Sequence, residues 1–197
     1  LLFFDPRPYF DHSYVKRAIT IATFLREFLP VRRYHLTALK IGFIIDSLKQ
    51  ICSSEILPFL LDRMVMRISC SYSDKIGVNA IVIGESFEKS SFQTLTDLYE
   101  ISSKYNKQIL SPLIGLSKKE ILDYSKRIGT FKFAKESEGE LKKPSTEPNK
   151  KAIMEIESRL EIDRLVEEAL SKAISINLKR GFDDVHDILN NYFLSKV

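Results

Sequence analysis

The sequence predicts an α/β protein built on a doubly wound, mostly parallel sheet. Short β-leaning runs alternate along the chain with stretches in which apolar residues recur at helical spacing. The run at residues 80–83 (Ala-Ile-Val-Ile) is continuously apolar, as expected for a strand that helices bury on both faces. An alternation of strands and helices along the chain is typical of parallel sheets with crossover helices.

The first predicted elements are a strand, a helix and a second strand. Residues 1–4 (Leu-Leu-Phe-Phe) predict a buried strand. The prolines at positions 6 and 8 prevent this strand from continuing. Asp11 or Ser13 can cap a helix that closes at Pro30. Residues 34–39 alternate in part and favour the second strand.

The middle of the chain continues the alternation. Two helices, a strand, a helix and a strand are predicted over residues 42–50, 54–73, 79–83, 95–101 and 108–110. Ser117 can cap the next helix, and Glu120 is placed to complete a capping box with it. Gly129 is expected to end that helix.

The last third of the chain changes in character. Residues 132–151 carry charges of both signs, two prolines and few apolar residues, which predicts an exposed connector. Residues 152–197 are expected to form a helical extension, with a long amphipathic stretch over 153–170 and a last helix over about 183–194. The predicted core is residues 1–131. Because the chain opens on an apolar strand without Met, we expect further residues upstream.

The composition narrows the class of protein. The chain has 197 residues, 44% hydrophobic and 28% charged, which suits a folded domain and excludes wholesale disorder. No apolar run reaches the roughly 18 to 20 residues that a membrane span needs, so no membrane contact is expected. Cys52 and Cys70 are predicted to be reduced, buried thiols of a cytoplasmic protein. The histidines lack ligand spacing, so no metal site is predicted. The net charge of +4 permits contact with a polyanion without establishing it.

In an open parallel sheet, ligands bind at the carboxyl ends of the strands. The segments directly after the predicted strands are 5–8, 40–42, 84–86 and 111–115. The segment at 84–86 (Gly-Glu-Ser) is the best placed, because glycine lets a ligand approach the backbone and a following helix offers free amides to an anion. An ordinary strand–helix turn that needs a glycine explains the same residues, so spacing alone leaves both interpretations open.

Five segments in one order resemble a known family. Residues 83–95 (Ile-Gly-Glu-Ser-Phe-Glu-Lys-Ser-Ser-Phe-Gln-Thr-Leu) are similar to its strand–loop–helix pattern TGE-S/A-LGQ-x-x-SQTL. Similar matches at sensible spacing occur at Pro6–Tyr9, Arg63–Ile68, Leu110–Gly115 and Arg127–Thr130. The family is that of the ThiI-type tRNA 4-thiouridine synthetases, also called tRNA sulfurtransferases and linked to thiamine biosynthesis. The resemblance covers roughly residues 1–175.

The resemblance implies a PP-loop ATP pyrophosphatase domain with a Rossmann-like fold. Such a domain would bind ATP with Mg²⁺ and adenylate a uridine of tRNA, so that sulfur from a persulfide can displace AMP and give 4-thiouridine. Its partners would be tRNA and a sulfur-donor protein. Carried over to this sequence, the family's ATP contacts outside the PP-loop fall on Phe3, Phe4, Asp62, Gly84 and Gln93. No catalytic residue is assigned.

Three basic residues are further candidates for phosphate or RNA contacts. Arg63 and Arg67 are four apart and share a helix face, although ion pairs with nearby carboxylates explain them equally well. Lys89 can restore a cation near the expected triphosphate. The apolar stripe over 185–193 leaves both closure of the core and a homodimer contact open.

The chain departs from the family pattern at several positions. The PP-loop motif S-G-G-x-D-S does not occur in it and would lie upstream of Leu1. Asp62 stands where the family has Lys or Arg, and Glu88 stands where it has Gly. A carboxylate in place of a cation beside a triphosphate costs about 1 to 4 kcal/mol, depending on the local dielectric. Glu138 takes the place of a cysteine that handles sulfur in many members.

Three functional hypotheses therefore stand. The first is a ThiI-like ATP pyrophosphatase domain that acts on tRNA. The second is a degenerate relative that keeps the fold as a non-catalytic nucleotide-binding protein or scaffold; it rests on Asp62, Glu88 and Glu138. The third is a PP-loop ATPase that acts on a small molecule.

Overall fold

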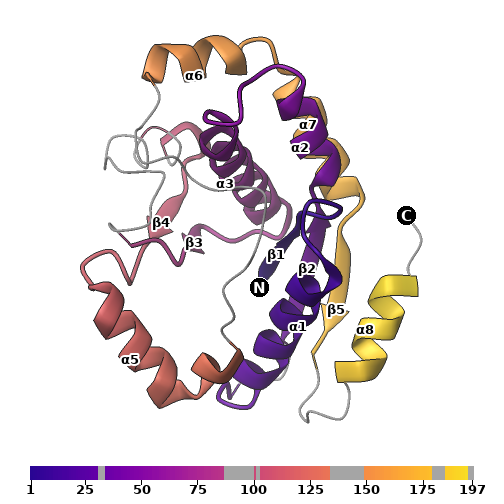
Figure 1. The fold of residues 1–197 in the computed structure, drawn as a ribbon, viewed down its shortest axis with the longest axis vertical. Coiled ribbons are helices and arrows are strands. Elements are labelled where there is room, and N and C mark those ends of the chain that lie inside the picture. Colours follow the sequence, from indigo (N-terminus) through magenta and orange to yellow (C-terminus); the bar gives the residue numbers. More distant parts are fainter. Residues whose placement is uncertain (31–33, 87–99, 101–102, 134–148, 179–184, 195–197) are drawn as a thin grey trace. The chain divides into compact units, whose positions relative to one another are not determined.

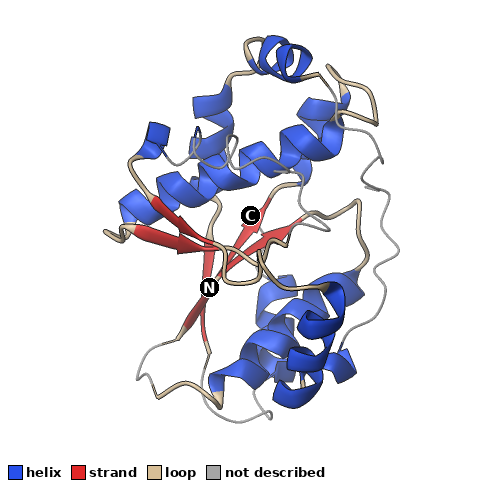
Figure 2. Ribbon diagram, turned by 90° about the vertical axis from the view of Figure 1, so that its left-hand side faces the viewer, coloured by secondary structure: helices blue, strands red, loops and turns tan. Residues whose placement is uncertain are grey.

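The computed structural model describes residues 1–30, 34–86, 100, 103–133, 149–178 and 185–194. These residues form an α/β protein of helices and short strands (Figures 1 and 2). The chain divides into two compact units. The first unit consists of Leu1–Gly42, Ser125–Glu140 and Ser171–Val197, and the second consists of Phe43–Tyr124 and Leu141–Leu170.

A three-stranded sheet forms the centre of the first unit, in the order β1-β2-β5. Strand β1 (Leu2–Asp5) runs parallel to β2 (His35–Lys40), with Leu2 opposite Thr37. Strand β5 (Ile174–Asn177) runs antiparallel to β2 on its other side. The parallel pair confirms the first two predicted strands.

Strand β5 adds a strand to residues 152–197, which were expected to form a helical extension. Its sequence, Ile-Ser-Ile-Asn, alternates apolar and polar residues, and its side chains alternate between half-buried and exposed. This period of two is the pattern of a strand with one covered face. The segment is only four residues long, and the helical periodicity on both sides of it obscured that pattern.

Two helices cover one face of this sheet. Helix α1 (His12–Arg26) begins at the predicted cap, where the Asp11 carboxylate accepts a hydrogen bond from the Ser13 amide at 2.7 Å. Helix α8 (Val185–Leu194) packs against α1 and β5 (Figure 1). The core between helices and sheet consists of Val15, Ile19, Ala22, Leu36, Ala38, Leu178, Leu189 and Tyr192. The predicted last helix is therefore part of this core.

The second unit is mainly helical around a parallel two-stranded sheet. Its helices are α2 (Gly42–Lys49), α3 (Leu57–Lys75), α6 (Lys150–Glu157) and α7 (Ile162–Ser171), of which α2 and α7 each share one terminal residue with the first unit. Strands β3 (Ala80–Val82) and β4 (Gln108–Leu110) pair in parallel, with Ile81 opposite Ile109. Both strands lie where the sequence predicted them.

Strand β3 is less buried than its apolar sequence predicted. Val82 is 68% exposed, whereas Ile83 and Ile109 pack against Met66 of α3 and Tyr105. Burial on both faces needs helices on both sides of the sheet. In the part of the chain that the structure describes, α3 covers one face only, so the prediction of a strand buried on both faces is wrong here. The helix predicted around 95–101 lies outside the described residues, apart from Glu100.

Helix α5 (Lys118–Ile128) has the predicted ends. The Ser117 amide donates to the Glu120 carboxylate at 2.8 Å, and the Glu120 amide donates to the Ser117 hydroxyl at 3.3 Å, which is the capping box. Gly129 ends the helix with a φ of +91°, and its amide donates to the Ser125 carbonyl at 3.0 Å. The short helix η1 (Thr130–Phe133) follows.

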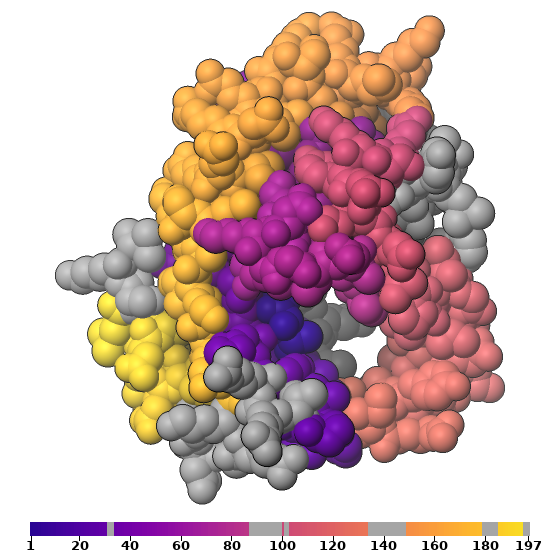
Figure 3. All heavy atoms as spheres, turned by 180° about the vertical axis from the view of Figure 1, so that it is seen from behind, coloured from indigo at the N-terminus to yellow at the C-terminus, as the bar shows by residue number. Residues whose placement is uncertain are grey.

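The amphipathic stretch predicted over 153–170 is two helices, α6 and α7, which lie at the surface of the second unit (Figure 3). Ser158 caps the end of α6, and its hydroxyl donates to the Glu155 carbonyl at 2.7 Å. Such local side-chain hydrogen bonds compete with continuation of a helix. No helix in the described residues is long and apolar enough to cross a membrane.

Candidate functional site

The carboxyl end of β1 carries a buried carboxylate. Asp5 is 1% exposed and receives hydrogen bonds from the Arg7 Nε at 2.9 Å and from the Tyr192 hydroxyl at 2.7 Å. The guanidinium of Arg7 lies over the rings of Tyr192 and Phe193, 5.4 and 4.9 Å from their centroids. Because these groups occupy both oxygens of Asp5, the carboxylate serves to hold the strand end rather than to bind a ligand.

The charge state of Asp5 follows from this geometry. Burial alone would raise the pKa of the Asp5 carboxyl, but hydrogen bonds from Arg7 and Tyr192 outweigh it and hold that pKa below its ordinary value. Burial, together with the hydrogen bond to Asp5, raises the pKa of the Tyr192 hydroxyl. Asp5 is thus an anion and Tyr192 a neutral donor at neutral pH.

The ends of β1 and β2 approach each other through the backbone. The Ile41 amide donates to the Asp5 carbonyl at 2.9 Å. A Cβ at Gly42 would overlap the carbonyl oxygen of Arg7, so only glycine fits at the start of α2. The predicted ligand segments 5–8 and 40–42 therefore pack on each other.

Phe3 and Phe4, the predicted ATP contacts in β1, are both half-buried. The ring of Phe3 packs against the core of the first unit and lies 5.8 Å from the Tyr14 ring. Phe4 points to the opposite face, as successive residues of a strand do. Because the Phe3 side chain is engaged in packing, a nucleotide contact at Phe3 would use its backbone.

The predicted basic contacts on α3 are ion-paired. Arg63 donates from Nε and Nη2 to the two oxygens of Glu157 at 2.7 and 3.0 Å, and Arg67 adds a bond from Nη2 at 3.1 Å. The Arg63 and Glu157 side chains are 13% and 11% exposed, and that of Arg67 is 7% exposed. One carboxylate from the end of α6 thus holds two cations of α3. Sequence reasoning missed Glu157, because it lies 94 residues beyond Arg63.

Gly84 follows β3 and is exposed. Its φ lies outside the left-handed region that favours glycine, and a Cβ built there has no neighbour within 4 Å in the described part of the chain. That part therefore supplies no packing reason for glycine at this position. Ile83, the residue before it, packs against Met66, so α3 and the Gly84 turn are neighbours within the second unit.

Of the remaining predicted site residues, the structure describes only Asp62. Asp62 is half-buried on α3, next to Arg63. Gln93 and Lys89 lie outside the described residues, as do the departures Glu88 and Glu138.

The cysteines are not activated. Both are free thiols, and Cys70 is buried while Cys52 is half-buried. Burial, together with the charge of Asp74, raises the pKa of the Cys70 thiol to about 11. Burial also raises the pKa of the Cys52 thiol. Neither thiol is therefore a ready nucleophile at neutral pH. Within the described residues no cluster of metal-binding side chains occurs.

A cavity of about 470 Å³ lies in the first unit, between β5 and α8. It contains none of the predicted site residues. Its walls are Ile174, Ser175, Ile176, Asn177, Asp187, Ile188, Asn191 and Tyr192. Sequence reasoning could not find it, because the strand that forms one wall was not predicted.

The fold is that of a solved nucleotide-binding enzyme. The structure aligns with a chain described as "Crystal structure of a 4-thiouridine synthetase - RNA complex with bound ATP", with a TM-score of 0.78 and 22% sequence identity. The alignment covers 90% of this chain and 48% of that one. The chain thus has the α/β fold of the PP-loop, Rossmann-like class, as the sequence predicted.

The family follows from a second comparison. The family described as "Thiamine biosynthesis protein (ThiI)" matches residues 1–162. This match covers more than half of the chain, and the chain therefore belongs to the ThiI family. The resemblance that the five motifs indicated is confirmed.

Curated relatives agree. The chain is 34% identical over 123 residues to a tRNA sulfurtransferase of Shewanella sp. (strain W3-18-1), and 36% identical over 123 residues to that of Shewanella piezotolerans (strain WP3 / JCM 13877). Each match covers 61% of this chain and 25% of the relative. The chain spans about a quarter of the length of the curated relatives that it matches.

Proposed function

We propose that this chain is the ATP-binding and uridine-adenylating part of a tRNA sulfurtransferase that forms 4-thiouridine. Family membership over residues 1–162 supports the proposal, as does the fold shared with a synthetase solved with RNA and ATP. The observation that carries it is Gly84, a glycine of a family motif at the end of β3, for which the described chain gives no packing reason. A ligand that approaches the backbone is a physical reason for glycine there.

The chemistry needs a leaving group at C4 of the uridine. In the proposed reaction the C4 oxygen attacks the α-phosphate of ATP and pyrophosphate leaves. The terminal sulfur of a persulfide then bonds to C4 as AMP departs, and a thiol reductant breaks the remaining S–S bond. Mg²⁺ bound with ATP would neutralise the triphosphate. The proposed ATP contacts in this chain are Phe3, Phe4, Asp62, Gly84 and Gln93.

The positive charge beside the nucleotide would come from α3. Arg63 and Arg67 share the single carboxylate of Glu157, so this pair of arginines is proposed to attract a phosphate of ATP or RNA. Lys89 is a further proposed contact. Asp62 on the same helix opposes them, because it adds a negative charge.

The sulfur is proposed to come from a partner protein. The raised pKa values of the Cys52 and Cys70 thiols leave little thiolate in this chain at neutral pH. A separate sulfur-donor protein would supply the persulfide, in the cytoplasm. A homodimer is also proposed. Light scattering, which gives the molar mass of the purified protein in solution, tests this proposal.

One alternative has specific support. Asp62 and the unactivated cysteines also suit a degenerate relative that has lost thiolation and keeps the fold as a nucleotide-binding scaffold. The two proposals differ in turnover. The first expects pyrophosphate release that tRNA stimulates, and the second expects none. Release that a metabolite stimulates, with no response to tRNA, would instead favour the small-molecule ATPase.

The first test is calorimetric titration of ATP with Mg²⁺ into the longest expressible form of the polypeptide. We expect micromolar binding that Gly84→Leu abolishes, because the added side chain would fill the space for the ligand. Lys75→Leu is the control, since it adds the same side chain at an exposed position of the second unit outside the predicted ligand segments. Absence of ATP binding by folded wild-type protein would overturn the proposal and leave the scaffold alternative.

A further inference from the structure

Aromatic rings and lysines gather on the first unit where α1 ends against η1. Phe24 belongs to the last turns of α1, and Phe28 follows that helix by two residues. Lys126 lies in the last turn of α5, and η1 lies against α1. We call this group the aromatic–lysine patch; its members are Phe24, Phe28, Lys126, Phe131, Lys132 and Phe133.

The rings and cations of the patch are in direct contact. The Phe24 ring meets those of Phe28 and Phe133 edge to face, with centroids 5.3 and 5.4 Å apart. The Lys132 ammonium lies 4.8 Å from the Phe24 centroid and 5.0 Å from that of Phe133. The Lys126 ammonium lies 5.4 Å from the Phe131 centroid. At these distances the positive charge of an ammonium group is attracted to the face of an aromatic ring.

The backbone holds the patch in place. The left-handed Gly129 turns the chain from α5 into η1, and the Thr130 hydroxyl donates to the Ser125 carbonyl at 3.3 Å. A Cβ at Gly129 would lie 3.2 Å from the edge of the Phe24 ring. Phe24 therefore packs directly on this turn, which is the family-like Ile-Gly-Thr segment 128–130.

Two rings of the aromatic–lysine patch are open to solvent. Phe28 is 60% exposed and Phe131 is 43% exposed, and the neighbouring Ile128 is 44% exposed. Large exposed apolar groups that lie together indicate an interaction surface. The lysines over the rings favour a partner that combines flat apolar groups with negative charge, as a nucleic acid does.

We propose that the aromatic–lysine patch binds an unpaired stretch of RNA. Bases stack on exposed aromatic rings, and each stacked base contributes about 1 to 3 kcal/mol. Phosphates pair with lysines, which gives binding a strong dependence on salt. In this arrangement Phe28 and Phe131 receive bases, and Lys126 and Lys132 receive the phosphates between them. The proposal rests on the proposed action on tRNA.

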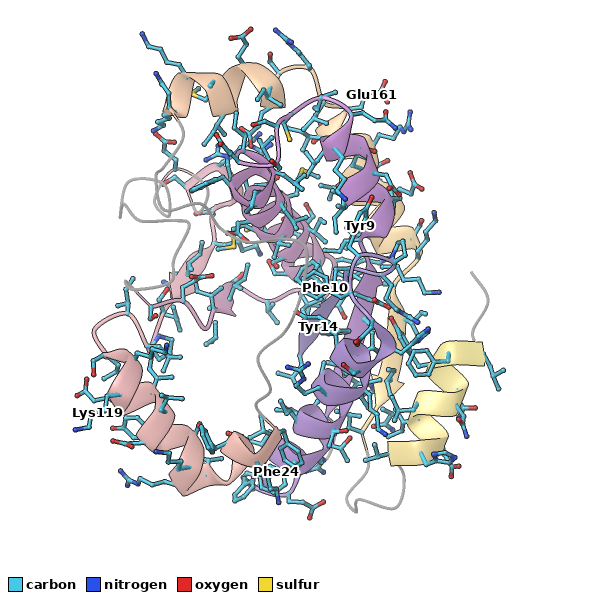
Figure 4. All side chains as sticks on the ribbon, viewed as in Figure 1. Tyr9, Phe10, Tyr14, Phe24, Lys119 and Glu161 are labelled. Atoms are coloured by element: carbon cyan, nitrogen blue, oxygen red, sulfur yellow. The ribbon has the colours of Figure 1, made fainter. Side chains whose placement is uncertain are left out.

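Within the first unit, the patch lies far from the carboxyl end of β1. Helix α1 begins just after the carboxyl end of β1 and has 15 residues, so its last turn lies about 22 Å away at ~1.5 Å per residue. Figure 4 shows Tyr14 and Phe24 toward opposite ends of this helix. A ligand at the carboxyl end of β1 therefore cannot touch the patch. Its role is to hold the RNA at a second point while the reacting uridine is presented elsewhere.

The test is fluorescence anisotropy of the whole chain with a labelled single-stranded RNA at several salt concentrations. We expect the double variant Phe28→Ala/Phe131→Ala to bind at least about thirtyfold more weakly, with the wild-type salt dependence. Lys126→Gln/Lys132→Gln should lower both the affinity and the slope against log salt, the slope by about 1.4 for two phosphates. Met154→Ala and Lys75→Gln, at exposed positions of the second unit, are the matched controls and should leave binding unchanged.

Circular dichroism first establishes that each variant is folded. If both double variants bind the RNA with wild-type affinity, the proposal that the patch binds RNA is overturned. The proposed function of the chain is then unaffected. No RNA binding by the wild-type chain would overturn the patch as well, and ATP titration of the same sample would show separately whether the nucleotide site survives. Concentration-dependent self-association that Phe28→Ala abolishes, with RNA binding intact, would assign the patch to a second copy and overturn the RNA proposal.

Discussion

The Tyr192 hydroxyl donates to Oδ2 of Asp5 over 2.7 Å, although the two residues lie 187 positions apart. Both are buried, with 2% and 1% of their surfaces exposed. The contact joins the last helix of the chain to the end of its first strand. Because α8 also supplies Leu189 to the core of the first unit, the C-terminal helix is needed to complete this unit.

Removal of the Tyr192 hydroxyl should destabilise the protein without changing the fold. Tyr192→Phe leaves a buried carboxylate with one donor fewer, which costs about 1 to 3 kcal/mol of unfolding free energy. Urea denaturation followed by circular dichroism measures the difference. Tyr14→Phe is the control on the same unit, since Tyr14 contributes ring contacts to Phe3 and Phe10. An equal loss in both variants would contradict a specific role for the Asp5 contact.

The pH dependence of stability should report on the same carboxylate. The pKa of Asp5 is lower in the folded protein than its ordinary value, because hydrogen bonds from Arg7 and Tyr192 outweigh burial. A lowered pKa contributes stability above the unfolded-state value of about 3.9, and this contribution is lost as the pH falls through the folded-state pKa. We therefore expect the unfolding free energy to drop below about pH 4, and to drop less in Tyr192→Phe than in Tyr14→Phe. Parallel pH profiles for the two variants would disprove the link.

Local patterns predicted the elements whose signals lie within a few residues. Asp11 caps α1, Glu120 completes a capping box with Ser117, and Gly129 ends α5, because each interaction involves groups at most four positions apart. Strand β5 was missed because four alternating residues carry little weight beside helices of ten. Its place at the edge of the sheet is set by pairing with β2, which lies far back in the sequence.

Contacts between residues far apart in the sequence also limited the prediction of the candidate site. The family resemblance identified Gly84, Arg63 and Arg67 as residues of interest. Whether an arginine meets a ligand or a carboxylate depends on long-range packing, and Glu157 reaches α3 only through the fold. The Asp5–Tyr192 contact was unpredictable for the same reason.

Gly42 should be intolerant of any side chain. A Cβ there would overlap the carbonyl of Arg7, a backbone atom that cannot move without disturbing the end of β1. Gly42→Ala should therefore lower the unfolding free energy by more than the ~1 kcal/mol that a typical point mutation costs. Thermal unfolding of Gly42→Ala beside Gly115→Ala checks this, because position 115 is open. A Gly42→Ala protein as stable as the Gly115→Ala control would show that the two strand ends do not pack as described.

Glu157 should stabilise the second unit far more than Glu155, which lies two residues earlier on α6. Glu157 neutralises part of the charge of two largely buried arginines, whereas Glu155 pairs with Arg159 on the surface, where the two side chains are 68% and 64% exposed. Loss of one partner of a buried ion pair costs about 3 to 5 kcal/mol, and a surface pair contributes at most about 1 kcal/mol. Urea denaturation of Glu157→Ala and Glu155→Ala measures both. In a double-mutant cycle, Arg63→Ala should recover part of the loss in Glu157→Ala, because the arginine left without its carboxylate is then removed as well. Additive effects of Arg63→Ala and Glu157→Ala would show that the two side chains do not interact in solution.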